Sequence, residues 1–115
     1  MTNEKPVTAC KQSVRAIHDV MDVIGGKWKI SIIACLCYEG SRCSNLLRII
    51  EGVSGKVVSR ELKDLEMNQL ITRTVKNMQP ITVEYAIRDY GKTLKEITNV
   101  IAEWGINHRE RNKRK

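Results

Sequence analysis

The clearest amphipathic pattern in the chain lies between residues 52 and 70. At helical spacing Val58, Leu62 and Leu65 fall on one face, while basic and hydroxyl side chains fall within a narrow arc on the opposite face. The members of that polar face are Lys56, Ser59, Arg60 and Lys63. The pattern predicts a helix over residues 54–68, capped by Ser54, with one buried side and one positively charged side. A helix of this kind fits the DNA major groove, which is wide enough to admit it.

Apolar positions elsewhere predict three helices before this segment and a hairpin with a further helix after it. Residues 13–24 have helical spacing that ends at Gly25-Gly26, residues 28–38 are almost entirely apolar, and residues 44–50 form a short third helix. Residues 70–76 and 82–88 are rich in β-branched side chains and predict a hairpin, and residues 90–110 predict one long helix. We therefore expect a mainly α fold with a small β-hairpin. This order is that of a winged helix-turn-helix, with long terminal helices available for dimerisation.

The length of 115 residues argues for one domain. We expect a flexible N-terminal arm at residues 1–12, the winged helix-turn-helix domain at 13–110 and a basic tail at 111–115. The terminal helices carry apolar stripes with few partners inside so small a domain, which predicts a homodimer. The predicted interface residues are Val14, Ile17, Met21, Leu94, Ile97, Ile101 and Trp104.

The formal net charge of +7 favours a polyanionic partner, although the C-terminal tail supplies much of the excess. The placement of charge is therefore the better guide, and it predicts double-stranded DNA as the partner. Gly25-Gly26-Lys27 does not form a phosphate loop, because an earlier glycine is missing and Trp28 follows where Ser or Thr is required. The predicted DNA-binding residues are Ser54, Lys56, Ser59, Arg60 and Lys63 on the helix, with Arg73, Lys76, Asn77 and Gln79 on the hairpin.

Other readings of these surfaces stay open. A basic helix face can be an ordinary solvated surface, and hairpin tips are polar in most proteins. A winged helix can also serve as a protein-interaction module. A third alternative is a regulator gated by a small molecule rather than by a thiol.

The four cysteines divide by context. Cys35 and Cys37 lie in an apolar segment and are expected in the core. Cys10 lies near the N-terminus and Cys43 precedes a helix, so either is a candidate redox sensor, with incidental thiols as the alternative. No spacing fits a metal site, and no cofactor is expected. No catalytic set, leader segment or membrane-spanning run is visible, so we expect a cytoplasmic protein that is not an enzyme.

Several short motifs together resemble the HxlR-type transcriptional regulators, a branch of the MarR-like winged-helix proteins. The matching blocks are IGGKW at 24–28, GVSGKVVSRELKDLE at 52–66, QLITRTV at 69–75, VEYAI at 83–87, Gly91, and AEWG at 102–105. The family often has Pro where Gly55 stands, an aromatic at Cys43 and Gly at Gln69. With Gln69 in place of Gly, we expect Asn68 to supply the turn after the helix.

The resemblance implies a homodimer that binds a near-palindromic operator, with a recognition helix over residues 54–68 and a wing over 72–88. It also implies a dimer interface built by the first and last helices. Many members of the family sense oxidants or electrophiles through a cysteine near the N-terminus, usually closer to the Gly-Gly pair than Cys10 is.

Overall fold

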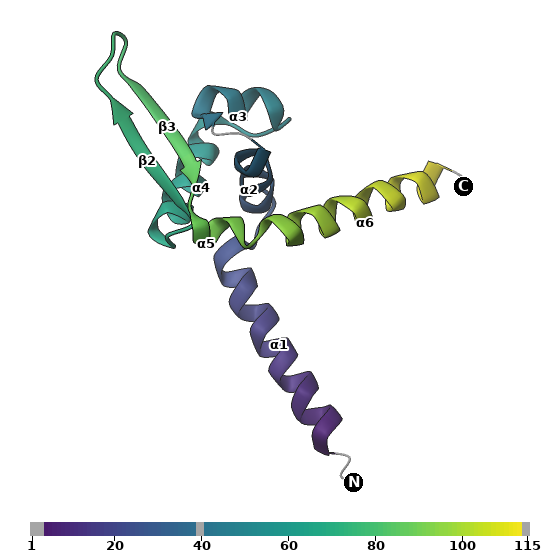
Figure 1. The fold of residues 1–115 in the computed structure, drawn as a ribbon. Helices are drawn as coiled ribbons and strands as arrows, with labels where there is room; N and C mark the ends of the chain where they lie inside the picture. Colours follow the sequence, from purple (N-terminus) through teal and green to yellow (C-terminus); the bar gives the residue numbers. More distant parts are fainter. Residues whose placement is uncertain (1–3, 39–40, 114–115) are drawn as a thin grey trace.

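The computed structural model of the chain describes residues 4–38 and 41–113, and the side chains of residues 7–38 and 45–113. It is mainly helical with an antiparallel hairpin, which confirms the predicted winged helix-turn-helix class (Figure 1). The elements in order are α1 (Glu4–Ile24), α2 (Lys29–Tyr38), β1 (Ser41–Arg42), α3 (Cys43–Ile49), α4 (Gly55–Met67), β2 (Ile71–Lys76), β3 (Thr82–Ile87), α5 (Asp89–Lys92) and α6 (Lys95–Lys113).

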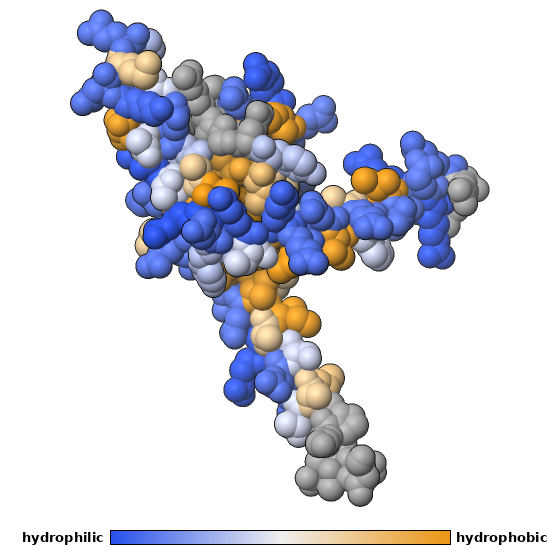
Figure 2. Space-filling model, in the orientation of Figure 1, coloured by the Kyte–Doolittle hydropathy of each residue, from blue (hydrophilic) through white to orange (hydrophobic). Residues whose placement is uncertain are grey.

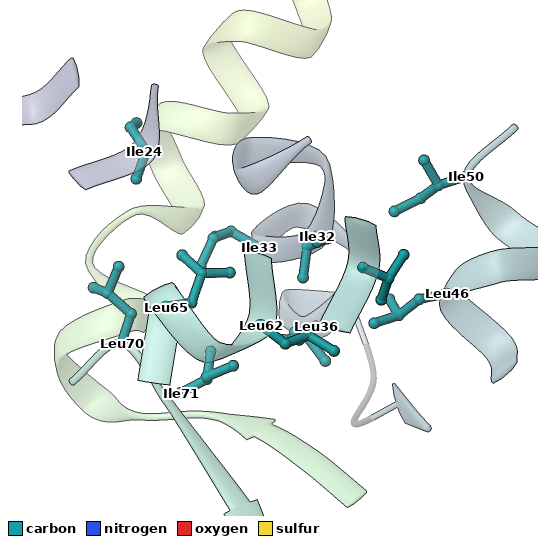
Figure 3. Close-up of a cluster of buried hydrophobic side chains, with 11 residues drawn as sticks. Ile24, Ile32, Ile33, Leu36, Leu46, Ile50, Leu62, Leu65, Leu70 and Ile71 are labelled. Atoms are coloured by element: carbon teal, nitrogen blue, oxygen red, sulfur yellow. The ribbon is translucent and has the colours of Figure 1, made fainter. Parts of the chain in front are cut away.

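The core is small and aliphatic, and it is formed where α2, α3 and α4 meet the start of the hairpin. Figure 3 shows its side chains converging from these elements. Val58, Leu62 and Leu65 are fully buried, as the helical spacing predicts. Each such side chain contributes about 1.5–3 kcal/mol through its removal from water. The buried face of α4 therefore fixes the rotation of this helix about its axis and turns the opposite face outward.

The hairpin pairs β2 with β3 from Ile71↔Ile87 to Lys76↔Thr82. A third strand, β1, pairs with β3 through Ser41↔Tyr85 and Arg42↔Glu84, giving the strand order β1-β3-β2. The sequence did not predict β1, because two residues are too few to show an alternating pattern. This short strand joins the hairpin to the segment before α3, while the far end of the hairpin projects away from the helices (Figure 1).

The segment predicted as an N-terminal arm, residues 1–12, is helical from Glu4 onward, where α1 begins. The apolar spacing that defines the first helix continues backward through Cys10 and Val7, which share the side of Val14. Pro6 does not prevent this, since it lies in the first turn, where a missing N–H leaves no hydrogen bond unmade. At the other end, α6 continues to Lys113, so the first residues of the predicted tail at 111–115 are helical.

The long helix predicted over residues 90–110 is also divided. The chain forms α5, turns at Thr93 and Leu94, and then begins α6. The amides of Thr93 and Leu94 donate to carbonyls three residues back, at 3.2 and 3.0 Å, and the Thr93 hydroxyl also donates to the Tyr90 carbonyl. Such tightened turns interrupt a regular helix.

Gly91 lies at this junction in close contact with backbone. A Cβ at position 91 would lie 2.2 Å from the Leu70 carbonyl oxygen and 2.6 Å from Cδ1 of Ile87. Only glycine fits there without displacing α5 from the start of the hairpin.

Two helices extend well beyond the core. The Cα radius of gyration is 17.6 Å, whereas a compact chain of this length has a value of about 13 Å. Figure 1 shows the cause, since α1 and most of α6 project from the body in different directions. Neither projecting part has a partner within the described chain that could cover its apolar side.

Candidate nucleic-acid interface

Helix α4 begins with a well-formed cap. Ser54 has extended backbone angles, and its hydroxyl oxygen accepts a hydrogen bond from the Val57 amide at 3.2 Å. No acidic residue lies in the first turn. The remaining free amides and the helix dipole make this end a favourable position for a phosphate. The hydroxyl of Ser54 thus has a capping role in addition to the DNA contact predicted for it.

The polar face of α4 is open to solvent as predicted. Lys56, Ser59, Arg60 and Lys63 are all exposed, on the side opposite the buried leucines. At the end of the helix, however, the predicted turn at Asn68 is wrong. Gln69 adopts the left-handed conformation with φ of 63°, whereas Asn68 has φ of −86° and donates its side-chain amide to the Asp64 carbonyl at 2.9 Å.

An ion cluster missed by the sequence reasoning connects α4 to α2. The ammonium of Lys29 bonds the Glu61 carboxylate and lies 3.4 Å from the Asp64 carboxylate. Glu61 also faces the Arg60 guanidinium, at 3.6 Å. The hydrogen bond that Lys29 donates to the Glu61 carboxylate is the main reason that the pKa of Lys29 is raised above its usual value, although burial opposes it. Lys29 is 15% exposed and is engaged inside the protein, so it is not placed as a backbone contact for DNA.

The wing residues are also exposed. Arg73, Lys76, Asn77 and Gln79 lie on β2 and on the loop that follows it. Lys76 forms an ion pair with Glu84 across the hairpin at 3.3 Å. Arg73 makes no ion pair with any residue that the structure describes. Within the described residues, the hairpin thus presents an exposed cation, Arg73, that is not engaged by a carboxylate.

The predicted dimer residues fall into two groups. Val14, Ile17 and Met21 on α1 are about half exposed, and the α6 residues Ile97, Ile101 and Trp104 are exposed by 42%, 49% and 68%. Figure 2 shows apolar side chains along both projecting helices. Leu94 differs, because it is half-buried against the core and belongs at least partly to the monomer. The exposed set also includes members that were not predicted, namely Val7, Val100 and Ile106.

The cysteines separate by exposure. Cys10 is exposed on α1. Cys35 and Cys37 are half-buried against the core, and burial raises the pKa of both thiols. The side chain of Cys43 lies outside the described residues, so its predicted sensor role has no structural counterpart here.

A pocket of about 200 Å³ lies between the end of α1, Leu70 and α5, with Val20, Tyr90 and Leu94 in its lining. Drug-sized ligands usually occupy pockets of about 300–1,000 Å³, so this space suits only a smaller molecule. Across residues 4–38 and 41–113 no group of side chains is arranged to hold a metal ion. Among the described helices, none is both long and apolar enough to cross a bilayer.

Comparison with known proteins agrees with this geometry. Residues 23–113 match the HxlR-like helix-turn-helix family. The Bacillus subtilis HTH-type transcriptional regulator YtcD is 36% identical over 93 residues, covering 81% of this chain and 74% of YtcD. A crystal structure of YtcD aligns with a TM-score of 0.77 at 35% identity, over 82% of this chain and 96% of that one.

Two further solved structures are similar. The redox regulator HypR in its reduced form aligns with a TM-score of 0.78 at 28% identity, covering 87% of this chain and 99% of HypR. A MarR-family transcriptional regulator from Enterococcus faecalis aligns with a TM-score of 0.71 at 27% identity, over 88% and 92% of the two chains. The family match and the YtcD identity together show that this chain belongs to the HxlR-like helix-turn-helix family and is a DNA-binding transcription regulator.

Proposed function

We propose that the chain acts as a homodimeric repressor on a near-palindromic operator, in the cytoplasm, where bacterial DNA lies. Helix α4 enters the major groove, with Ser59, Arg60 and Lys63 reaching base edges or flanking phosphates. Ser54 and Lys56 bind phosphate at the start of the helix. The wing residues Arg73, Lys76, Asn77 and Gln79 contact the minor groove or its phosphates. A dimer seated over a promoter blocks access of the polymerase, and repression follows from that.

The observation that carries the proposal is the exposed polar face of α4, which is held outward by the three fully buried side chains on its other side. This face combines two lysines, an arginine and a serine, the side chains that bond phosphates and guanine edges. An interaction module for another protein would more naturally present an apolar or acidic face at this position.

Self-association is supported by the two projecting helices. The radius of gyration is 17.6 Å, whereas a compact chain of this length has about 13 Å. The difference comes from the two projecting helices, whose apolar stripes lie in water. A second copy supplies the same stripes and can cover both through a twofold axis. Two copies of α4 then face successive major grooves about 34 Å apart.

The test combines selection and mass measurement. Wild-type protein is used to select duplexes from a random-sequence library, and its mass is measured by light scattering. We expect an inverted repeat with half-sites separated by about one helical turn, and a mass about twice the 13.1 kDa of one chain. Two results would contradict the proposal. One is that no preferred sequence is recovered, and the other is that a monomeric form binds the selected duplex as tightly as the dimer does. Trp104→Glu should shift the protein to monomer and abolish selection, whereas Lys113→Glu, farther along α6, should not.

Thiol regulation is a second candidate, favoured by one observation. Cys10 is exposed on α1, which we propose as part of the dimer interface, so its oxidation would alter the packing of two copies. HypR, a redox regulator, has a similar fold. Diamide should release selected DNA from wild-type protein but not from Cys10→Ser. Release that persists in Cys10→Ser, or follows addition of a small ligand instead, would favour Cys43 or the ligand-gated alternative.

A further inference from the structure

The recognition helix carries as many acids as bases. Lys56, Arg60 and Lys63 are matched in number by Glu61, Asp64 and Glu66 within α4, so the formal charge of this helix is zero. Its positive face therefore depends on where the charges lie rather than on their sum. A carboxylate that is engaged by a cation of another element opposes this face less.

Lys29 is such a cation. It extends from the first turn of α2, and its ammonium is shared between Glu61 and Asp64, which are one turn apart on α4. The side chains of Lys29 and Glu61 are 15% and 11% exposed, so water screens their interaction only weakly. Asp64, at 49% exposure, is held less firmly.

The Glu61 carboxylate also connects this cluster to the DNA-facing surface. One of its oxygens bonds Lys29, and the other lies 3.6 Å from Nη2 of Arg60. Two cations thus share one carboxylate, and each weakens the hold of Glu61 on the other. Without Lys29, the full negative charge of Glu61 would act on Arg60 alone. The guanidinium, which is 64% exposed, would then be drawn back against the protein and away from a DNA base or phosphate.

We propose that Lys29 is a positioning residue for DNA recognition that acts through Glu61. By engaging this carboxylate it leaves Arg60 free to reach DNA, and it fixes α4 against α2 at the same point. This inference rests on the proposed use of the α4 face in DNA binding. It assigns to Lys29 no contact with DNA.

The experiment measures affinity for the duplex selected by wild-type protein, in four variants. Lys29→Met should weaken binding about tenfold, within the range of couplings between contacting residues. Adding Glu61→Gln to it should restore binding to within about threefold of wild type, because the unopposed carboxylate is gone. Lys29→Arg should bind like wild type. The matched control is Lys27, a neighbouring exposed lysine whose ammonium lies 4.9 Å from the centre of the Trp28 ring. Lys27→Met removes the same charge without touching the cluster.

Two further readouts separate positioning from other roles. A lysine that contacts phosphate contributes about 0.9 per contact to the slope of log affinity against log salt. In an Arg60→Ala background, where no guanidinium is left to position, Lys29→Met should therefore leave the slope unchanged if Lys29 does not touch phosphate itself. Circular dichroism and thermal melting establish that each variant is folded at the assay temperature. If Lys29→Met is unfolded there, the Lys29→Met/Glu61→Gln and Lys29→Arg proteins still decide between the roles.

The outcomes are distinct. Four results would each overturn the inference and leave the proposed function intact. They are wild-type binding by Lys29→Met, an equal loss in Lys27→Met, a double variant no better than the single variant, and a salt slope that Lys29→Met flattens in the Arg60→Ala background. A double variant that folds but does not bind would likewise overturn it. A wild-type protein that binds no duplex would overturn both.

Discussion

The salt dependence of DNA affinity should report which basic side chains reach phosphates. Each chain presents five exposed basic residues on α4 and the hairpin, which are Lys56, Arg60, Lys63, Arg73 and Lys76. Arg60 and Lys76 are engaged with Glu61 and Glu84, at 3.6 and 3.3 Å. The other three form no ion pair with a described residue.

The expected slope follows from these counts. If only the three free cations contact phosphates, a dimer neutralises about six phosphates, and log affinity falls against log salt with a slope of about −5. If both engaged cations also leave their carboxylates, about ten phosphates are neutralised and the slope is about −9. The measured value therefore shows whether the two ion pairs open when DNA binds.

Fluorescence anisotropy with a labelled duplex, titrated from about 50 to 200 mM salt, measures this slope. Lys63→Ala removes two contacts per dimer and should flatten it by about 1.8. Lys113→Ala, at the distant end of α6, provides the matched control and should not change it. A wild-type slope shallower than about −2, or equal slopes in wild type and Lys63→Ala, would refute the assignment of this face to the phosphates.

Three other results are expected. Arg60→Ala should weaken binding to the selected duplex by about 1–3 kcal/mol while changing affinity for random DNA much less, and an equal loss on both would make Arg60 a phosphate contact. Leu62→Ala should lower the free energy of unfolding in urea by about 2–5 kcal/mol, since its side chain is 0% exposed and leaves a cavity; a loss below about 1 kcal/mol would contradict the packing described. During iodoacetamide labelling near neutral pH, mass spectrometry should show that Cys10 is modified before Cys35 and Cys37. Burial raises the pKa of the latter two thiols, so less of each is present as the reactive thiolate. Faster labelling of either half-buried thiol would indicate that the core opens.

The sequence predicts best where one periodic pattern covers several turns. The buried and exposed faces of α4 could be read from the spacing of Val58, Leu62 and Leu65, because a 3.6-residue period leaves little choice of rotation. The hairpin was predictable for a similar reason, since β-branched runs flank a short loop. The direction of the polar face follows from these local patterns, and its use on DNA stays a prediction.

Contacts between distant segments could not be predicted in this way. No spacing rule connects Lys29 to Glu61, which are 32 residues apart, and so the compensation of charge on α4 was missed. Strand β1 exists only because β3 lies beside it. The beginning of α1 was missed for a different reason: the polar residues near the N-terminus obscured an apolar spacing that continues to Val7.

The backbone contact at Gly91 has a consequence for the direction of α6. Because α5 rests on the Leu70 carbonyl with no room for a side chain at position 91, this main-chain contact helps to set the angle at which α6 leaves the body of the protein. One added methyl group at position 91 would displace α5 and, with it, the start of α6. In the homodimer proposed above, the distance between the two copies of α4 would then change as well.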